Sequence, residues 1–166
     1  RTLVSATSEP TVRIWDVTTG RELWSLKDFD DSVIRVQFTT DGRTLATTDA
    51  NVRTNRGTMS LWDVAAQSLT LRVENQLVLR FCPNSSSVVT SGTDSTLRII
   101  DFKTNPPSTV MAATSDFVHS GVLTSDGTIL LTCSDLGTVT TWNIATGRET
   151  RRFNCQDTRP RSVALS

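Results

Sequence analysis

The sequence contains few of the residues from which disulfide frameworks and metal sites are built. It has three cysteines, Cys82, Cys133 and Cys155, and a single histidine, His119. The number of cysteines is odd and no C-x-x-C spacing occurs, which argues against a disulfide framework and against a zinc site. Such cysteine usage fits a reducing compartment, so we expect a cytoplasmic protein without a metal or cofactor.

A net charge and long apolar runs are also missing. Seventeen basic residues balance seventeen acidic ones, so no overall field draws the chain to nucleic acid, and we expect no such partner. No apolar run approaches the roughly 20 residues of a membrane span, so we expect no membrane association. The chain opens on Arg1 without Met and without the apolar segment of a signal peptide. We therefore expect it to be a piece of a longer protein.

What the sequence does contain is an internal repeat. The stretch VRIWDVTTGRE (12–22) returns as VTTWNIATGRE (139–149), with the weaker copies MSLWDVAAQ and LRIIDFKTN between them. The residue before the Asp or Asn recurs at Trp15, Trp62, Ile100 and Trp142, and a turn landmark recurs at Asp41-Gly42, Asn84-Ser85 and Asp126-Gly127. Two independent landmarks with one period of roughly 42 residues indicate a repeat architecture.

Each repeat has the pattern of short strands separated by turns. In the second repeat, strands are predicted at 33–38, 44–47, 58–64 and 69–73, because β-branched residues alternate there and Asp-Gly marks a hairpin. Four strands in a unit of roughly 40–45 residues are typical of a propeller blade. The predicted fold is therefore all-β, a β-propeller of four-stranded antiparallel blades, with four blades' worth of strands in this chain.

These motifs resemble the WD-repeat (Trp-Asp repeat) family over essentially the whole chain. Trp15-Asp16 and Trp62-Asp63 match the dipeptide that names the family, Trp142-Asn143 is a close variant, and the phrasing is similar to that of bacterial members. The family usually links a His, a Ser or Thr, an Asp and the Trp in a buried network. Here no Gly-His precedes a blade, Glu9 stands at one Asp position, and Ile100 replaces one Trp. We expect an incomplete network and blades held more by packing.

The blade boundaries follow from the repeat, and residues 1–166 are predicted to form a single propeller segment. Residues 1–27 supply strands two to four of one blade. Whole blades follow at about 28–73, 74–113 and 114–155, and residues 159–166 match the first strand of a further or closing blade. The chain is then either a closed four-blade ring or an arc of a larger propeller, and we favour the arc.

The resemblance also indicates where a partner would bind. Strands of a blade alternate in direction, so the inter-blade linkers and the second-to-third strand turns share one face, which also carries the Asp49 to Gly57 insertion. Long loops on a rigid scaffold often carry function. We predict a protein or peptide partner there, and no small-molecule substrate. The predicted contacts are Ser32, Asn75, Phe117 and Arg159 in the linkers, Ser8, Thr93 and Asp135 beside the turns, and Arg53 and Arg56 in the insertion.

Catalysis is the alternative that the sequence supports least. It offers one histidine and neither a nucleophile elbow, a phosphate-binding loop nor clustered metal ligands, although a triad that uses His119 remains formally open. We therefore predict no catalytic residues and no metal ligands. A regulatory propeller appended to a kinase, NTPase or protease-like domain outside this segment is the other alternative, and the sequence names no such domain.

Overall fold

The computed structural model describes residues 1–7, 9–51, 56–83, 86–104, 108–155, 160 and 162–165, without the side chains of Arg56 and of residues 108–110. All regular structure in these ranges is β-strand. The strands are β1 (Thr2–Ala6), β2 (Val12–Asp16), β3 (Glu22–Leu26), β4 (Val33–Phe38), β5 (Thr44–Asn51), β6 (Arg56–Asp63), β7 (Ser68–Glu74), β8 (Gln76–Phe81), β9 (Ser87–Gly92), β10 (Thr96–Asp101), β11 (Ser108–Ala113), β12 (Val118–Leu123), β13 (Ile129–Ser134), β14 (Thr138–Asn143) and β15 (Arg148–Asn154).

The strands form antiparallel sheets in sequence order. One sheet has three strands, β1-β2-β3, and three sheets have four, β4 to β7, β8 to β11 and β12 to β15. The prediction of repeated four-stranded antiparallel units is thus confirmed. The strand predicted at 159–166 differs, because residues 160 and 162–165 lie in no strand. A strand exists only where a neighbour takes its backbone hydrogen bonds, and sequence pattern alone does not supply that neighbour.

The chain divides into two compact units, Arg1–Gln76 and Leu77–Ser166. Each unit has its own core, made where the inward residues of adjacent strands meet. In the first unit the fully buried Val12, Ile14 and Leu45 pack with Trp62. In the second unit Val89, Leu97 and Leu130 do the same with Trp142.

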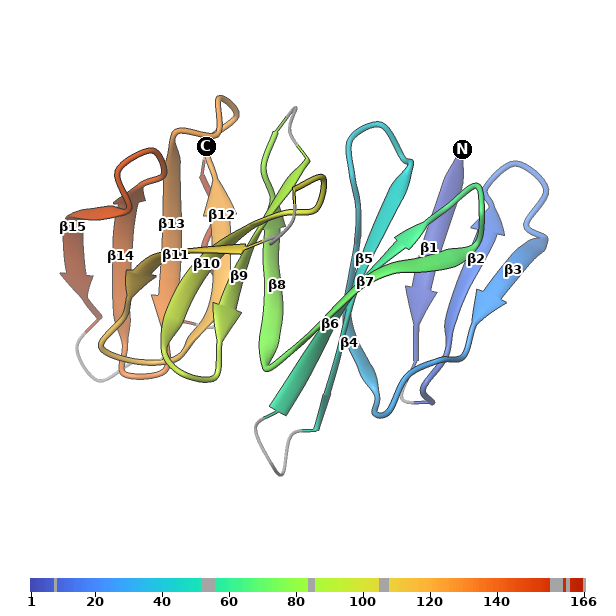
Figure 1. The fold of residues 1–166 in the computed structure, drawn as a ribbon, viewed down its shortest axis with the longest axis horizontal. Coiled ribbons are helices and arrows are strands. Elements are labelled where there is room, and N and C mark those ends of the chain that lie inside the picture. Colours follow the sequence, from blue (N-terminus) through green and yellow to red (C-terminus); the bar gives the residue numbers. More distant parts are fainter. Residues whose placement is uncertain are drawn as a thin grey trace. The chain divides into compact units, whose positions relative to one another are not determined.

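Strand direction separates the connections of the first unit between two ends (Figure 1). The turns β2–β3, β4–β5 and β6–β7 lie at one end. The β1–β2 turn, the β3–β4 linker, the β5–β6 turn and the β7–β8 linker lie at the other, which we call the linker end. The tight turns Thr19-Gly20 and Asp41-Gly42 lie away from the linker end, as the alternation predicts.

The insertion in the second repeat is a longer hairpin rather than a long loop. The sequence predicts irregular chain from Asp49 to Gly57, but β5 runs on to Asn51 and β6 begins at Arg56. Ala50 pairs with Gly57, and Asn51 pairs with Arg56. Extending the ladder satisfies backbone groups that an irregular loop would have to leave to water. The prediction of a loop over the whole insertion is therefore wrong, and residues 52–55 lie outside the described part.

A hydrogen bond from tryptophan recurs in three sheets. The indole Nε1 donates to a hydroxyl on the adjacent strand of the same sheet: from Trp15 to Ser5 at 2.8 Å, from Trp62 to Thr47 at 3.0 Å, and from Trp142 to Thr132 at 2.9 Å. In each case the hydroxyl residue pairs with the residue two before the Trp. The third sheet has Ile100 there, fully buried, so packing replaces this bond.

Candidate functional site

Two of the predicted contact residues lie at the linker end of the first unit. Ser32 directly precedes β4, and its carbonyl accepts a hydrogen bond of 3.1 Å from the amide of Ala50. Asn75 alone connects β7 to β8, with a φ of 57°. Asparagine tolerates this left-handed conformation better than most residues, which explains how one residue makes the turn. Both residues are therefore positioned by the backbone.

Phe117 and Asp135 come together in the second unit. Phe117 is half-buried, and its carbonyl accepts a 3.1 Å hydrogen bond from the amide of Asp135. Asp116 bonds the amides of Phe117 and Leu136 through its two carboxyl oxygens. Thr93 is half-buried in the β9–β10 turn. The structure thus places these three predicted residues at linkers or second-to-third strand turns.

Ser8, Arg53 and Arg159 lie outside the described residues, and the side chain of Arg56 does too. These four stay predictions.

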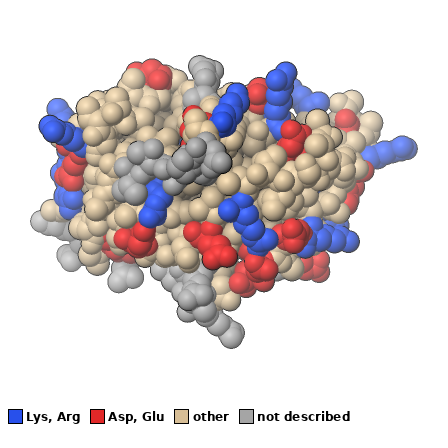
Figure 2. Space-filling model, in the orientation of Figure 1, with Lys and Arg blue, Asp and Glu red and all other residues tan. Residues whose placement is uncertain are grey.

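A groove of about 340 Å³ opens at the linker end of the first unit. We call it the acidic groove, and its polar lining comprises Asp30, Asp31, Asp49, Asn51, Thr58, Glu74 and Asn75. The β3–β4 linker supplies the first two residues, the β5–β6 hairpin the next three, and the end of β7 with its linker the last two. Figure 2 shows acidic side chains gathered along the lower edge of this unit. The volume is in the range of sites that hold a side chain or small ligand.

Asp49 is the buried carboxyl group of the acidic groove. It is 2% exposed, and its Oδ1 has no hydrogen-bond partner. Burial raises the pKa of Asp49 above its ordinary value, a shift that its own backbone amide and the nearby Arg72 partly oppose. A buried carboxylate with an open acceptor is costly in a folded protein. Asp49 is therefore an incompletely satisfied polar group of the acidic groove.

The other charges of the acidic groove are partly matched by contacts. Arg72 on β7 binds the Asp30 carboxylate at 2.5 Å, and the Asn51 amide donates to Asp31 at 3.3 Å. Among the described side chains, four carboxyl groups thus line the acidic groove and one guanidinium group binds at it. Because like charges in a partly enclosed space repel one another, the acidic groove favours a positive group.

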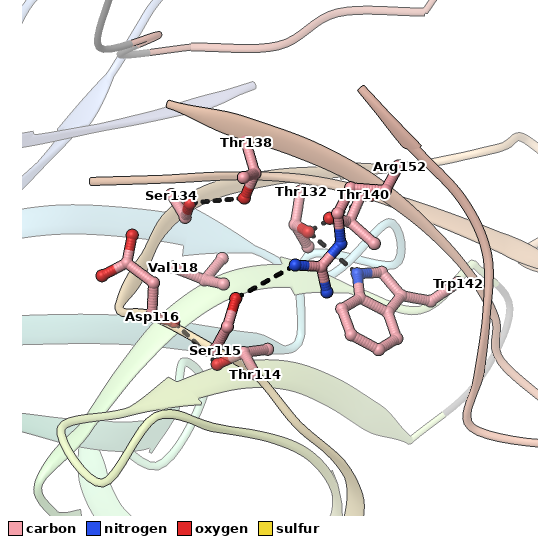
Figure 3. A pocket seen from close by; sticks show the side chains of 10 residues that line it. All are labelled: Thr114, Ser115, Asp116, Val118, Thr132, Ser134, Thr138, Thr140, Trp142 and Arg152. Carbon is pink, nitrogen blue, oxygen red and sulfur yellow. Dashed lines mark hydrogen bonds between the residues drawn. The ribbon is translucent and has the colours of Figure 1, made fainter. Parts of the chain in front are cut away.

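The second unit has a much smaller hollow beneath β13 and β14 (Figure 3). Its volume is about 10 Å³, enough for about one water molecule. Trp142 and Thr132 share their hydrogen bond at one side, and Ser134 and Thr138 share another of 2.7 Å. Arg152 lies across it and bonds Ser115 at 3.2 Å. This hollow is part of the blade's internal packing and too small for a ligand.

The single histidine lies beside a cysteine and a carboxylate. His119 Nδ1 is 3.9 Å from Cys133 Sγ, and its Nε2 is 3.7 Å from Asp135 Oδ1. Cys133 is fully buried, so a substrate has no access to its sulfur. The described ranges contain no group of three or more His, Cys, Asp or Glu arranged to hold a metal ion. They also contain no helix that could cross a membrane.

Comparison with known proteins finds that one repeat matches a family model. Residues 74–101, which include β8 to β10, match the family model described as WD domain, G-beta repeat. The match falls on the repeat that has Ile100 in place of tryptophan. Together with the repeated four-stranded sheets, it confirms the resemblance to WD repeats. No curated protein matches the chain. Repeats of this family generally form non-catalytic scaffolds for protein interaction.

Asp49 is the functional candidate that the sequence analysis did not single out. The Trp62-to-Thr47 bond fixes the repeat register, and Asp49 stands two residues after Thr47. The same position holds Thr7, Gly92 and Ser134 in the other three repeats. Alignment of the repeats therefore shows one charged residue at a position that otherwise holds small neutral residues. This difference could have marked Asp49 as a functional candidate. It becomes meaningful only when the structure shows that the position is buried.

Proposed function

We propose that this chain is a non-catalytic, cytoplasmic scaffold that binds a protein or peptide partner at the linker end of its blades. The observation that carries the proposal is the acidic groove, an opening of ligand size at a predicted binding face of the first unit. Its walls are strand ends and short linkers, and rigid elements of this kind hold a binding surface in a fixed geometry.

Residues predicted for this face flank the acidic groove. Asn75 lines it, and Ser32 is tied by its backbone to Ala50, next to Asp49. The insertion arginines, Arg53 and Arg56, belong to the hairpin whose base forms one wall. A partner that covered the acidic groove and the hairpin would contact a contiguous stretch of the first unit.

Site-specific photo-crosslinking tests the proposed face. A benzophenone amino acid replaces Asn75 at the linker end or, as the control, the exposed Ala65 in the β6–β7 turn at the opposite end. We expect one discrete adduct from source-cell extract with the probe at Asn75 and none with the probe at Ala65. The adduct should weaken in the Arg53→Ala/Arg56→Ala variant. Equal adducts from both probe positions, or none from either, would contradict the proposal.

A further inference from the structure

The position of Asp49 in the repeat shows that its charge is not needed to build a blade. The equivalent residue of the fourth sheet, Ser134, is 4% exposed and shares a 2.7 Å hydrogen bond with Thr138 across the β13–β14 pair. In the second sheet, Thr58 stands at the place of Thr138 and pairs with Asp49. A serine would therefore fill this position with a satisfied hydroxyl. The carboxyl group calls for another explanation.

The carboxyl group of Asp49 lies at the acidic groove, where a ligand could supply a counter-charge and a hydrogen-bond partner. It lines the acidic groove, is 98% buried, and its Oδ1 has no hydrogen-bond partner. Its desolvation raises the pKa of Asp49, so the ionised form is held at a cost. A positive group that enters the acidic groove would provide both a counter-charge and a hydrogen-bond donor.

Arg72, the described cation that acts on Asp49, binds another carboxylate. Arg72 holds the mainly exposed Asp30 through a 2.5 Å contact, and its attraction to Asp49 offsets only part of the desolvation effect. Asp31 receives the neutral amide of Asn51, and Glu74 is exposed at the end of β7. Among the side chains that the structure describes, the acidic groove therefore keeps an excess of negative charge after these contacts are counted.

We propose that the acidic groove binds an arginine side chain of the protein partner, with Asp49 as the buried carboxylate and Asp31 and Glu74 as the outer ones. This inference rests on the proposed function and names the chemistry of its ligand. A guanidinium group offers five donors in a planar fork and is weakly hydrated, which suits carboxylates spread around a partly enclosed groove. Its interaction with them strengthens as water leaves.

A peptide pair tests the charge requirement directly. The ¹⁵N-labelled 166-residue chain is titrated with the peptide acetyl-Gly-Ser-Arg-Ser-Gly-amide, and in parallel with the same peptide carrying citrulline, which has the shape of arginine without its charge. We expect the arginine peptide to shift the amide signals of Asp31, Asn51 and Thr58 in low salt. The citrulline peptide should shift them at least tenfold less at equal concentration. Equal effects of the two peptides would overturn the proposal.

Three variants place the binding at the acidic groove. Asp49→Ser should weaken the arginine peptide at least tenfold, and Glu74→Gln, at an exposed residue, should weaken it severalfold without disturbing the fold. Asp41→Ser removes the same charge at the opposite end of the unit and should leave binding unchanged. Unchanged binding to both groove variants, or equal loss in Asp41→Ser, would contradict the proposal.

Crosslinking with the probe at Asn75 separates this inference from the proposed function. If the Asp49→Ser chain forms the same adduct as the unaltered chain, the linker end binds a partner but the arginine proposal is wrong. If the unaltered chain forms no adduct while the arginine peptide still binds the acidic groove, the scaffold proposal is wrong. Loss of the adduct in Asp49→Ser, with its amide spectrum otherwise retained, supports both.

Discussion

Replacing Asp49 with serine should make the chain more stable at neutral pH. The substitution removes a buried carboxylate whose Oδ1 has no partner and introduces the residue that the fourth sheet holds at the same position as Ser134. A buried polar group without its partner costs about 1–3 kcal/mol. The serine hydroxyl lies opposite Thr58, as Ser134 lies opposite Thr138, and can form the same hydrogen bond. We expect a gain in unfolding free energy of about 1–3 kcal/mol, or roughly 2–10 °C in Tm for a chain of this size.

The gain should depend on pH in a direction that the structure fixes. Burial raises the pKa of Asp49 above its ordinary value of 3.8. The folded chain therefore holds the proton more firmly than the unfolded chain does. The stabilisation by this proton is fully present below pH 3.8 and is lost as pH rises through the folded pKa. Both proteins keep the neighbouring charged residues Asp30, Asp31, Glu74 and Arg72. The difference between their stabilities therefore changes with pH mainly because of Asp49. The advantage of the serine variant should thus grow from acid to neutral pH.

Urea unfolding at pH 3 and pH 7 measures the effect, with Asp41→Ser as the opposite control. Hydrogen bonds from the Thr39 hydroxyl and the Arg43 amide lower the pKa of Asp41. That carboxylate stabilises the fold above its ordinary pKa, and the stabilisation is lost as pH falls. Asp41→Ser should therefore be less stable than the unaltered chain at pH 7, with a smaller difference at pH 3. An Asp49→Ser chain that is less stable at pH 7, or whose advantage grows on acidification, would refute the reasoning.

Three further predictions concern the blades. Trp62→Phe removes the 3.0 Å bond to the buried Thr47 and should cost about 1–3 kcal/mol by urea unfolding; no loss would show that packing alone holds this sheet. Gly147→Ala should lower Tm more than Gly42→Ala does. Both glycines have a positive φ, but only at Gly147 would a Cβ meet a backbone carbonyl oxygen of β11, at 2.3 Å. Equal losses of Tm would contradict this close approach. Asp94, whose pKa is lowered to about 2 by an arginine of β10, stabilises the fold above pH 3.8 and less as pH falls toward 2. Asp94→Asn should flatten acid unfolding in that window, and an unchanged pH profile would contradict this assignment.

Repeat spacing was enough to predict the sheets. Period-2 alternation and the turn residues place strands to within a few residues, as in the second repeat, where the predicted 33–38 is β4. The conformation of the insertion was predicted wrongly for a physical reason. Asp49, Ala50 and Asn51 are not typical strand residues, yet each pairs across the hairpin with the start of β6. Backbone pairing overrides local propensity when a partner strand is adjacent, and single-sequence reasoning does not contain that adjacency.

The candidate site was predicted only in outline. Strand alternation correctly placed Ser32 and Asn75 at the end of the first unit where linkers and second-to-third turns lie. It could not predict the acidic groove, which depends on how three separate segments pack. The acidic linker that contains Asp30 and Asp31 looks like a solvated run in the sequence. In the structure this linker lines the acidic groove together with the buried carboxylate of Asp49 from another strand, so it becomes part of a candidate site.

The two effects predicted for Asp49→Ser have opposite signs, and this opposition distinguishes a binding residue from a structural one. A residue that served only the fold would lower stability when replaced by the serine that the fourth sheet holds at the same position. Asp49→Ser should instead raise the stability of the chain and weaken its binding of the arginine peptide. Binding sites often keep groups that the free fold holds at a cost, because the ligand later satisfies them. In the acidic groove the group held at a cost is the carboxylate of Asp49. It is 2% exposed, and its Oδ1 has no hydrogen-bond partner. If Asp49→Ser lowers both stability and peptide affinity, Asp49 is a structural residue of the blade. The loss of binding would then follow from the damaged fold, and the proposal that Asp49 binds the arginine would be wrong.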